Sequence, residues 1–286
     1  MMSNDLALAQ QQVTAGWMIF LAFATLLALL IIHAIGVFSR RPFPDFDRLS
    51  PAEHPGTLAL IFFAALVAWI YTPVFYISYR GIPATTQGTY ALSPQDQVAI
   101  GVIASLMGLA VLIIGNQTFR EQGLRHLGLT WRRLRSAIPQ GILGIALVLP
   151  LLAWVTIFTM IAWRLMQLTH PEKHELLEIL DKTHDPKLAT LLVITAVVIA
   201  PVYEELLFRG HLQTLLRYFF RRPWPAILLS SAAFSLVHPW WTQPPIFFLA
   251  LCLGYAYERT NNLWVSILIH ALFNATSVVI SLFVHA

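Results

Sequence analysis

The chain has 286 residues, of which 57% are hydrophobic and 11% are charged, and it carries a formal net charge of +4. Soluble domains average about 25% charged residues, so this chain has too few charges to cover the surface of a water-soluble globule. High apolar content excludes a disordered chain and the single cysteine excludes a disulfide scaffold, which leaves a multi-pass membrane protein.

Eight apolar runs along the chain predict helices, because a bilayer core is crossed by about 20 helical residues. The fold class expected is all-α, a polytopic membrane protein with about eight transmembrane helices around a polar intramembrane active-site chamber. The runs lie at 13–38, 57–79, 98–115, 137–163, 188–208, 226–238, 244–257 and 263–284. The sixth and seventh are short for full spans, and a turn rich in Trp and Pro separates them.

Basic residues fall unevenly on the two sides of the expected bilayer. With the N-terminus outside, thirteen of the 18 lysines and arginines lie in inner loops. Because positive residues are retained inside, this bias predicts an integral membrane protein with both termini outside. A bacterial plasma membrane is the expected location. We expect N-terminal helices with a basic surface segment in 1–136 and a transmembrane bundle in 137–286, with its catalytic core at 188–284.

Two segments between the runs are amphipathic. Residues 120–135 interleave arginines with leucine and tryptophan, which predicts a segment on the inner membrane surface. Residues 172–184 mix leucine and isoleucine with acids, which predicts a short helix on the outer surface. That helix contains His-Glu-Leu-Leu-Glu at 174–178, but it lacks the second histidine of a zinc-protease helix and is not interpreted as a metal site.

Three charges stand inside an apolar helix. Of the 32 acidic and basic residues, 29 fall in loops or at span edges, and the others are Glu204, Glu205 and Arg209. Placing a carboxylate in the bilayer centre is unfavourable by about 3 kcal/mol. Glu205 and Arg209 are i and i+4, so Arg209 can neutralise Glu205, whereas Glu204 is rotated by about 100°. One carboxylate is expected to be structural and one free for chemistry, unless the pair ends the helix at water.

Polar residues interrupt two later helices. His238 ends the segment Phe234-Ser-Leu-Val-His238, and His270 is followed by Asn274 at i+4 on the same face. Either motif alone could hold helices together through hydrogen bonds. Together with two glutamates on a third helix, they supply base, acid and polarising groups at membrane depth.

The three motifs, in this order and spacing, resemble the CPBP intramembrane protease family. That family includes the type II CAAX prenyl endopeptidases, lysostaphin-resistance protein A-like proteins and Abi bacteriocin-immunity proteins. The motifs are Glu204-Glu205-x-x-x-Arg209, Phe234-x-x-x-His238 and His270-x-x-x-Asn274, and the likeness covers about residues 188–284.

The resemblance implies hydrolysis of peptide bonds within the membrane by water that Glu204 and His238 activate. Glu205, held by Arg209, would stabilise the site, and His270 with Asn274 would donate hydrogen bonds to the oxyanion. Zinc is the alternative cofactor, with Glu204, His238 and His270 as its ligands. Both assignments fit the residues, and metal-independent activation of water is favoured slightly.

The expected partners are the lipid bilayer and a prenylated protein or another membrane-associated peptide. Neither nucleic acid nor nucleotide is expected, because the basic residues mark membrane edges and no glycine-rich phosphate loop occurs. The serine, aspartyl and His-Glu-x-x-His motifs of other intramembrane proteases are absent from the sequence. The alternative function is a non-catalytic membrane scaffold or an immunity-type protein with the same fold.

Overall fold

The structure is a computed structural model that describes residues 18–33, 43, 54–85, 89–168, 175–183 and 185–284. Several predictions fall outside these residues: the two ends of the first helix at 13–17 and 34–38, the inner arginines at 40, 41 and 48, and residues 172–174 and 184 of the outer amphipathic segment.

Each of the eight apolar runs contains a helix. In the first half these are an unlabelled helix, Met18–His33, then α2 (Pro55–Arg80), α3 (Pro94–Phe119) and α4 (Trp131–Leu165). A short 3-10 helix, η1 (Gly123–Leu127), lies between α3 and α4. Local sequence explains their ends. At the start of α3, Ser93 and Asp96 form a reciprocal capping box beside a proline, and the end of α2 is capped by Gly81 with φ of 63°.

Among the described residues, the second half holds one long helix, which contains two π-helical segments, and four further α-helices. The long helix runs continuously through α6 (Pro186–Ile194), η2 (Thr195–Ile199), α7 (Ala200–Glu205), η3 (Leu206–Gln213) and α8 (Thr214–Phe220). It is preceded by α5 (Glu175–Lys182) and followed by α9 (Pro223–Leu236), the 3-10 turn η4 (Trp240–Thr242), α10 (Gln243–Thr260) and α11 (Leu263–Val284). The two short runs are thus two separate helices, α9 and α10.

Five helices of the described residues have the length and apolar composition to cross a membrane. They are α2, α3, α4 with η1, the long helix α6–α8, and α11; the first helix and α9 are apolar but shorter. No strand occurs among the described residues, whose β-structure is one isolated bridge between Ala84 and Tyr90. The chain is therefore an all-α polytopic membrane protein.

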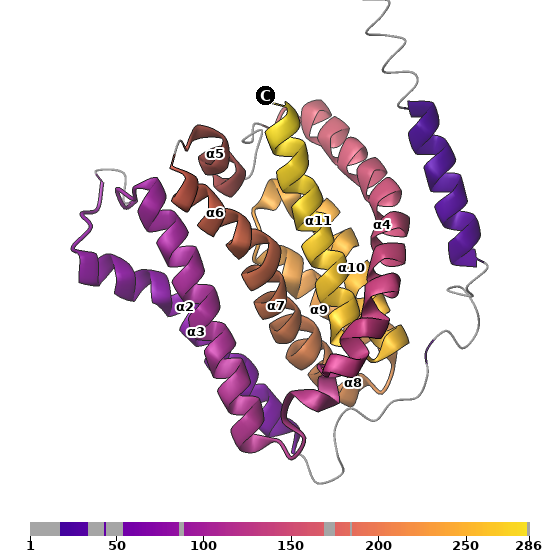
Figure 1. Cartoon of the computed structure of the whole chain (residues 1–286), viewed down its shortest axis with the longest axis horizontal. Helices are drawn as coiled ribbons and strands as arrows, with labels where there is room; N and C mark the ends of the chain where they lie inside the picture. Colours follow the sequence, from indigo (N-terminus) through magenta and orange to yellow (C-terminus); the bar gives the residue numbers. More distant parts are fainter. Residues whose placement is uncertain are drawn as a thin grey trace, which may run out of the picture.

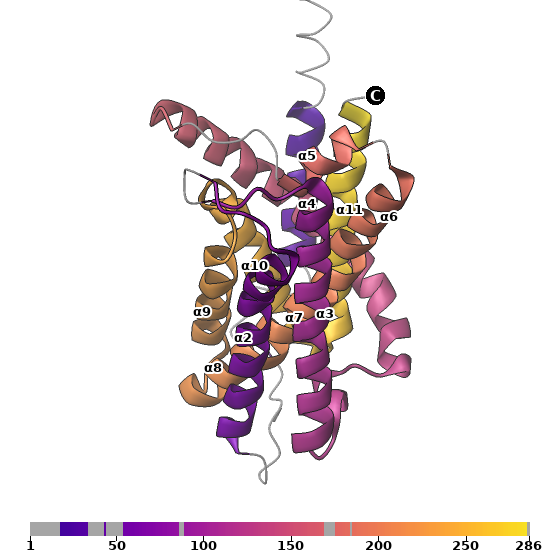
Figure 2. The same ribbon diagram turned by 90° about the vertical axis from the view of Figure 1, so that its left-hand side faces the viewer.

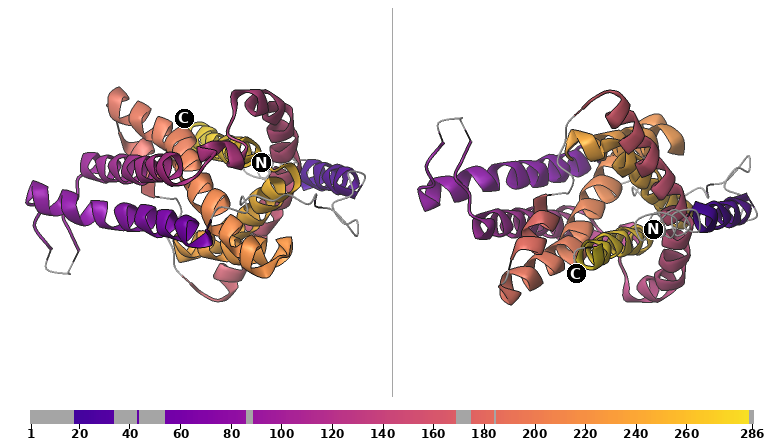
Figure 3. Two further views of the ribbon diagram at one scale, coloured as in Figure 1. Left: turned by 90° about the horizontal axis from the view of Figure 1, so that it is seen from below. Right: turned by 90° about the horizontal axis from the view of Figure 1, so that it is seen from above.

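The long helix α6–α8 lies at the centre of the bundle (Figure 1). The pair α2 and α3 packs on one side of it, and α4, α9, α10 and α11 lie on the other (Figures 1 and 2). End views show the first helix beside α4, opposite the α2–α3 pair (Figure 3), where Trp154 Nε1 donates to Thr25 Oγ1 over 3.0 Å. The first helix begins, and α11 ends, at the same end of the bundle (Figure 1).

The two amphipathic segments pack against the bundle. In the basic segment at 120–135, only residues 131–135 are α-helical, and they form the first turn of α4. The segment contacts the bundle through Arg133, whose Nη1 donates to the Asn261 carbonyl over 2.5 Å. The expected domain boundary after residue 136 therefore falls inside α4, and it stays a proposal. The helix α5 buries Ile179 and Leu180 against apolar residues of α3, α6 and α11.

A close approach between α3 and α7 makes Gly108 sensitive to substitution. A Cβ atom at Gly108 would lie 2.4 Å from Cε2 of the buried Tyr203 ring, the neighbour of Glu204. We expect Gly108→Ala to lower the free energy of unfolding by about 1–3 kcal/mol, as overpacking does. Gly101→Ala on the same helix is the control, because nothing lies within 4 Å of its added Cβ. Equal melting temperatures of the two variants would contradict this packing.

Candidate active site

Two π-helical segments flank the glutamates. The segments η2 and η3 precede and follow α7, which ends at Glu205. In a π turn each N–H bonds to the carbonyl five residues back, and such turns are rare and occur frequently at functional sites. In η2, the Ala200 N–H bonds to the Thr195 carbonyl. The next donor in this register belongs to Pro201, which has no N–H, so the Ala196 carbonyl loses its helical partner.

Glu205 and Arg209 form a buried ion pair. Arg209 Nη1 donates to Glu205 Oε1 over 2.8 Å, and both side chains are 0% exposed. The second guanidinium nitrogen, Nη2, donates to the Ala250 carbonyl on α10 over 3.2 Å. The guanidinium also lies 4.4 Å from the centre of the Phe234 ring on α9. The i, i+4 pair expected from the sequence is thus present, and it is fixed by two further helices.

His270 lies between the two carboxylates. Its Nδ1 donates to Glu205 Oε1 over 2.9 Å, and its Nε2 lies 3.7 Å from Glu204 Oε2. Because an ionised carboxylate only accepts hydrogen bonds, Nδ1 is assigned the proton, and Nε2 of the neutral ring then has a lone pair toward Glu204. The Glu204 side chain is 22% exposed, whereas Glu205 has no exposure. Adjacent glutamates therefore occupy different environments.

His238 stands at the end of α9, where the chain turns into η4. Its Nδ1 lies 2.8 Å from the Phe234 carbonyl, which can only accept, so Nδ1 is assigned the proton and Nε2 a lone pair. The Phe234 ring contacts both histidines, with centroid distances of 4.7 Å to His238 and 5.8 Å to His270. One aromatic side chain thus contacts three of the sequence-predicted groups, Arg209 included.

Asn274 bonds to the carbonyl that the π turn leaves without a helical partner. Its Nδ2 donates to the Ala196 carbonyl over 2.7 Å. The sequence pattern predicts an oxyanion-binding role for this amide, which stays a prediction. The structure adds a second role for Asn274, the stabilisation of the π turn before the glutamates.

This second role predicts a loss of stability in Asn274→Leu. The substitution removes the donor to the Ala196 carbonyl, and an unsatisfied buried polar group lowers stability by about 1–3 kcal/mol. Thr276→Val is the matched control, because Thr276 Oγ1 donates to the Leu272 carbonyl within the same helix. Thermal unfolding should separate the two variants. An Asn274→Leu protein as stable as Thr276→Val would contradict this role.

The candidate zinc ligands do not form a three-ligand set in this arrangement. Among the residues that the structure describes, no three His, Cys, Asp or Glu side chains are grouped so that they could hold a metal ion. Glu204 and His270 approach each other. The Nδ1 atom of His238 is hydrogen-bonded to the Phe234 carbonyl of its own helix. We therefore derive no step through a metal.

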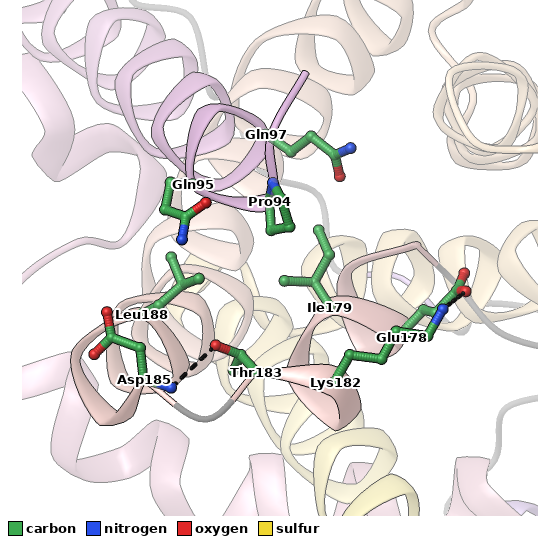
Figure 4. A pocket seen from close by; sticks show the side chains of 9 residues that line it. All are labelled: Pro94, Gln95, Gln97, Glu178, Ile179, Lys182, Thr183, Asp185 and Leu188. Carbon is green, nitrogen blue, oxygen red and sulfur yellow. Dashed lines mark hydrogen bonds and ion pairs between the residues drawn. The ribbon is translucent and has the colours of Figure 1, made fainter. Parts of the chain in front are cut away.

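Two pockets lie in other parts of the molecule. One, of 520 Å³, is formed by the starts of α3 and α6 together with α5 (Figure 4), where Lys182 pairs with Glu178. The other, of 450 Å³, lies in the turn from α3 into η1 and is lined by Arg120 and Arg125. Neither is lined by a sequence-predicted site residue, so the polar chamber around the glutamates stays a prediction.

Two buried polar residues near the site were missed by sequence reasoning. His211 is 0% exposed, donates through Nδ1 to the Leu206 carbonyl and receives Asn116 Nδ2 at Nε2 over 2.9 Å. Gln213 is also 0% exposed and hydrogen-bonded to α9 and α10. For Gln213 a signal existed, since it lies four residues after Arg209. For His211 no such spacing exists, and its Asn116 partner is 95 residues away.

Comparison with known families identifies the segment that carries this geometry. Residues 186–276 match the family model described as type II CAAX prenyl endopeptidase Rce1-like. This segment is similar to the Rce1-like family. No curated protein matches the chain, and no solved structure matches it. The Rce1-like segment contains the site residues predicted from the sequence: Glu204, Glu205, Arg209, His238, His270 and Asn274. The matched segment covers about a third of the chain, and its similarity is to a family of membrane-embedded proteases of the CAAX-protease type.

Proposed function

We propose that this protein is an intramembrane endopeptidase that hydrolyses peptide bonds with water activated by Glu204 and two histidines. The observation that carries the proposal is the position of His270 between two carboxylates in different environments. Glu205 is fully buried and paired with Arg209, whereas Glu204 is partly exposed. Such asymmetry separates a supporting group from a reacting one.

Glu204 is the proposed general base. A water bound at its carboxylate would lose a proton to Glu204, and the water oxygen would form a bond to the carbonyl carbon of the scissile peptide. The lone pair on His238 Nε2 would accept a hydrogen bond from the second hydrogen of that water, which stays on the oxygen and becomes the hydroxyl of the new carboxyl group. The tetrahedral intermediate then collapses as the C–N bond breaks, and the proton held by Glu204 passes to the leaving amine.

Glu205 and Arg209 act on His270 in this scheme. The hydrogen bond from His270 Nδ1 to Glu205 fixes the ring so that Nε2 faces Glu204 at 3.7 Å. While Glu204 holds the proton taken from water, it can donate a hydrogen bond to His270 Nε2, and the Glu205 carboxylate stabilises the positive charge that develops on the ring, as in other carboxylate–histidine pairs. Arg209 orients the Glu205 carboxylate through their 2.8 Å ion pair, in which both side chains have no solvent exposure.

The proposed substrate is a prenylated protein or another membrane-associated peptide that enters from the bilayer. The family match supports the class of substrate, and the apolar helices around the glutamates support access from lipid. We infer activation of water without a resident metal, because the described side chains do not provide three converging ligands.

The test compares purified wild type and Glu204→Gln in lipid nanodiscs on a prenylated CAAX peptide, the same peptide without its prenyl group and a general peptide. Each reaction is run with and without a chelator. Wild type should cleave the prenylated peptide best, and the chelator should leave the rate unchanged. Loss of activity in the chelator, with recovery on adding zinc, would contradict the metal-independent mechanism. If the protein still performed its role in the cell when Glu204→Gln had removed peptide cleavage, the result would favour the scaffold function.

A further inference from the structure

A row of polar contacts connects the long helix to α10 beyond the catalytic groups. Residues Arg209, Gln213 and Arg217 follow one another at intervals of four on the long helix. Their partners Ala250, Gly254 and Glu258 follow at the same interval on α10. We call these three pairs, Arg209–Ala250, Gln213–Gly254 and Arg217–Glu258, the polar ladder. The constant offset means that the two helices run in the same direction, as Figure 1 shows.

Gln213 is the middle and most fully bonded step of the ladder. Its Nε2 donates to the Gly254 carbonyl over 3.1 Å and to Glu258 Oε1 over 3.0 Å. Its Oε1 accepts from Ser230 Oγ of α9 over 3.1 Å. The side chain is 0% exposed. A single amide therefore connects the long helix to both α9 and α10.

Gly254 makes this contact possible because it has no side chain. A Cβ atom there would lie 2.7 Å from Gln213 Oε1 and 3.2 Å from Ile227 Cγ2. The first distance is shorter than real Cβ contacts, so the amide would have to move. The third step is an ion pair, in which Arg217 Nε lies 3.7 Å from Glu258 Oε2.

The ladder fixes how far α10 can slide along the long helix. A shift by one helical turn would separate all three pairs at once, and buried polar groups that lose their partners are strongly unfavourable in a membrane interior. The first step involves Arg209, whose Nη2 bonds to Ala250 while Nη1 holds Glu205. The position of α10 thus determines where Arg209 holds Glu205, and Glu205 in turn orients His270.

We propose that Gln213 is a positioning residue for the Glu205–Arg209 pair, acting through the polar ladder and its contact with Gly254. The inference rests on the proposed proteolytic function and deepens it. In the part of the chain that the structure describes, the hydrogen bonds of Gln213 go to Gly254, Glu258 and Ser230, and none goes to Glu204, Glu205 or either site histidine. Gln213 acts only through the relative position of the two helices.

The kinetic test uses Gln213→Met, which keeps the length of the side chain but removes all three hydrogen bonds. We expect kcat to fall by about tenfold to a hundredfold, as small misplacements of catalytic groups do, while KM changes less than about twofold. Gly254→Ala should act in the same direction, and Gly101→Ala on α3, with open space around it, should change neither constant. Ser230→Ala, which removes one of the three bonds of Gln213, gives a milder variant if Gln213→Met folds poorly.

A double-mutant cycle separates positioning from a general loss of folded protein. In an Arg209→Lys background the first step of the ladder is altered, so Gln213→Met should cause much less further loss of kcat than in wild type. Equal losses of kcat in both backgrounds, or a KM that rises with the fall in kcat, would overturn the positioning role.

A second cycle does not depend on activity. The double variant Gln213→Met with Gly254→Ala should lower the thermal midpoint by less than the sum of the two single variants. In Gln213→Met the hydrogen bond to the Gly254 carbonyl is already lost, so Gly254→Ala cannot disturb it again. If wild type cleaves the peptide but the shifts of the two variants add, the polar ladder is overturned and the proposed function is not. Coupled shifts in a wild type that cleaves no peptide would overturn the proposed function, and with it the catalytic role of Gln213.

Discussion

Glu204→Gln is expected to lower the rate of peptide hydrolysis by about 10²–10⁴-fold, the range that general acid–base groups contribute. The amide keeps the size of the side chain but cannot take a proton from water. Glu204 is partly exposed and makes no buried ion pair with arginine in the described residues, so its loss leaves the Glu205–Arg209 pair in place. Folding should therefore survive, and KM should change little.

The matched control for this substitution is Glu178→Gln. Glu178 is an exposed glutamate on α5 that pairs with Lys182 by i, i+4 spacing, away from the histidines. Surface pairs of this kind contribute little to stability. Cleavage of a prenylated CAAX peptide, followed by mass spectrometry at several concentrations, gives kcat and KM for both variants. If the two variants cleaved at equal rates, Glu204 would not be the base.

Arg209→Met is expected to lower the free energy of unfolding by about 3–5 kcal/mol, the usual result of breaking a buried ion pair on one side. The substitution leaves the Glu205 carboxylate without its cationic partner in a site with no exposure. It also removes the donor to the Ala250 carbonyl and the contact with the Phe234 ring. The loss should appear as a large fall in melting temperature and in the yield of folded protein.

Two comparisons isolate the charge effect. Arg164→Met removes an exposed arginine from the last turn of α4 and should leave stability nearly unchanged. The double variant Glu205→Gln with Arg209→Met removes both charges, so it should be more stable than Arg209→Met alone, because no uncompensated charge stays buried. Denaturant unfolding in detergent micelles measures all three proteins. A double variant less stable than the single one would contradict this explanation.

The helices could be predicted from the sequence because apolar run length depends directly on bilayer thickness. The runs at 226–238 and 244–257, short as they are, correspond to α9 and α10. The Glu205–Arg209 pair could also be predicted, since an i, i+4 contact depends only on local helical geometry. The family likeness over 188–284 agrees with the matched segment 186–276.

Contacts between distant helices could not be predicted in the same way. An ordinary helical period gives no indication of η2 and η3, and so it could not pair Asn274 with the Ala196 carbonyl. The bond between Asn116 and His211 joins α3 to the long helix and has no local signature. The polar ladder had one, a polar residue at every fourth position from Glu205 to Arg217, but only the structure shows that Gly254 and Glu258 face it.

The most direct test of the central claim is hydrolysis of a prenylated CAAX peptide by the purified protein in nanodiscs, in water enriched in ¹⁸O. If Glu204 activates water for attack on the scissile carbonyl, mass spectrometry should find one ¹⁸O atom in the new carboxyl group of the product. Glu204→Gln should form this product at least about 100-fold more slowly. Absence of cleavage by wild type, or equal formation of the labelled product by Glu204→Gln, would contradict the proposed mechanism.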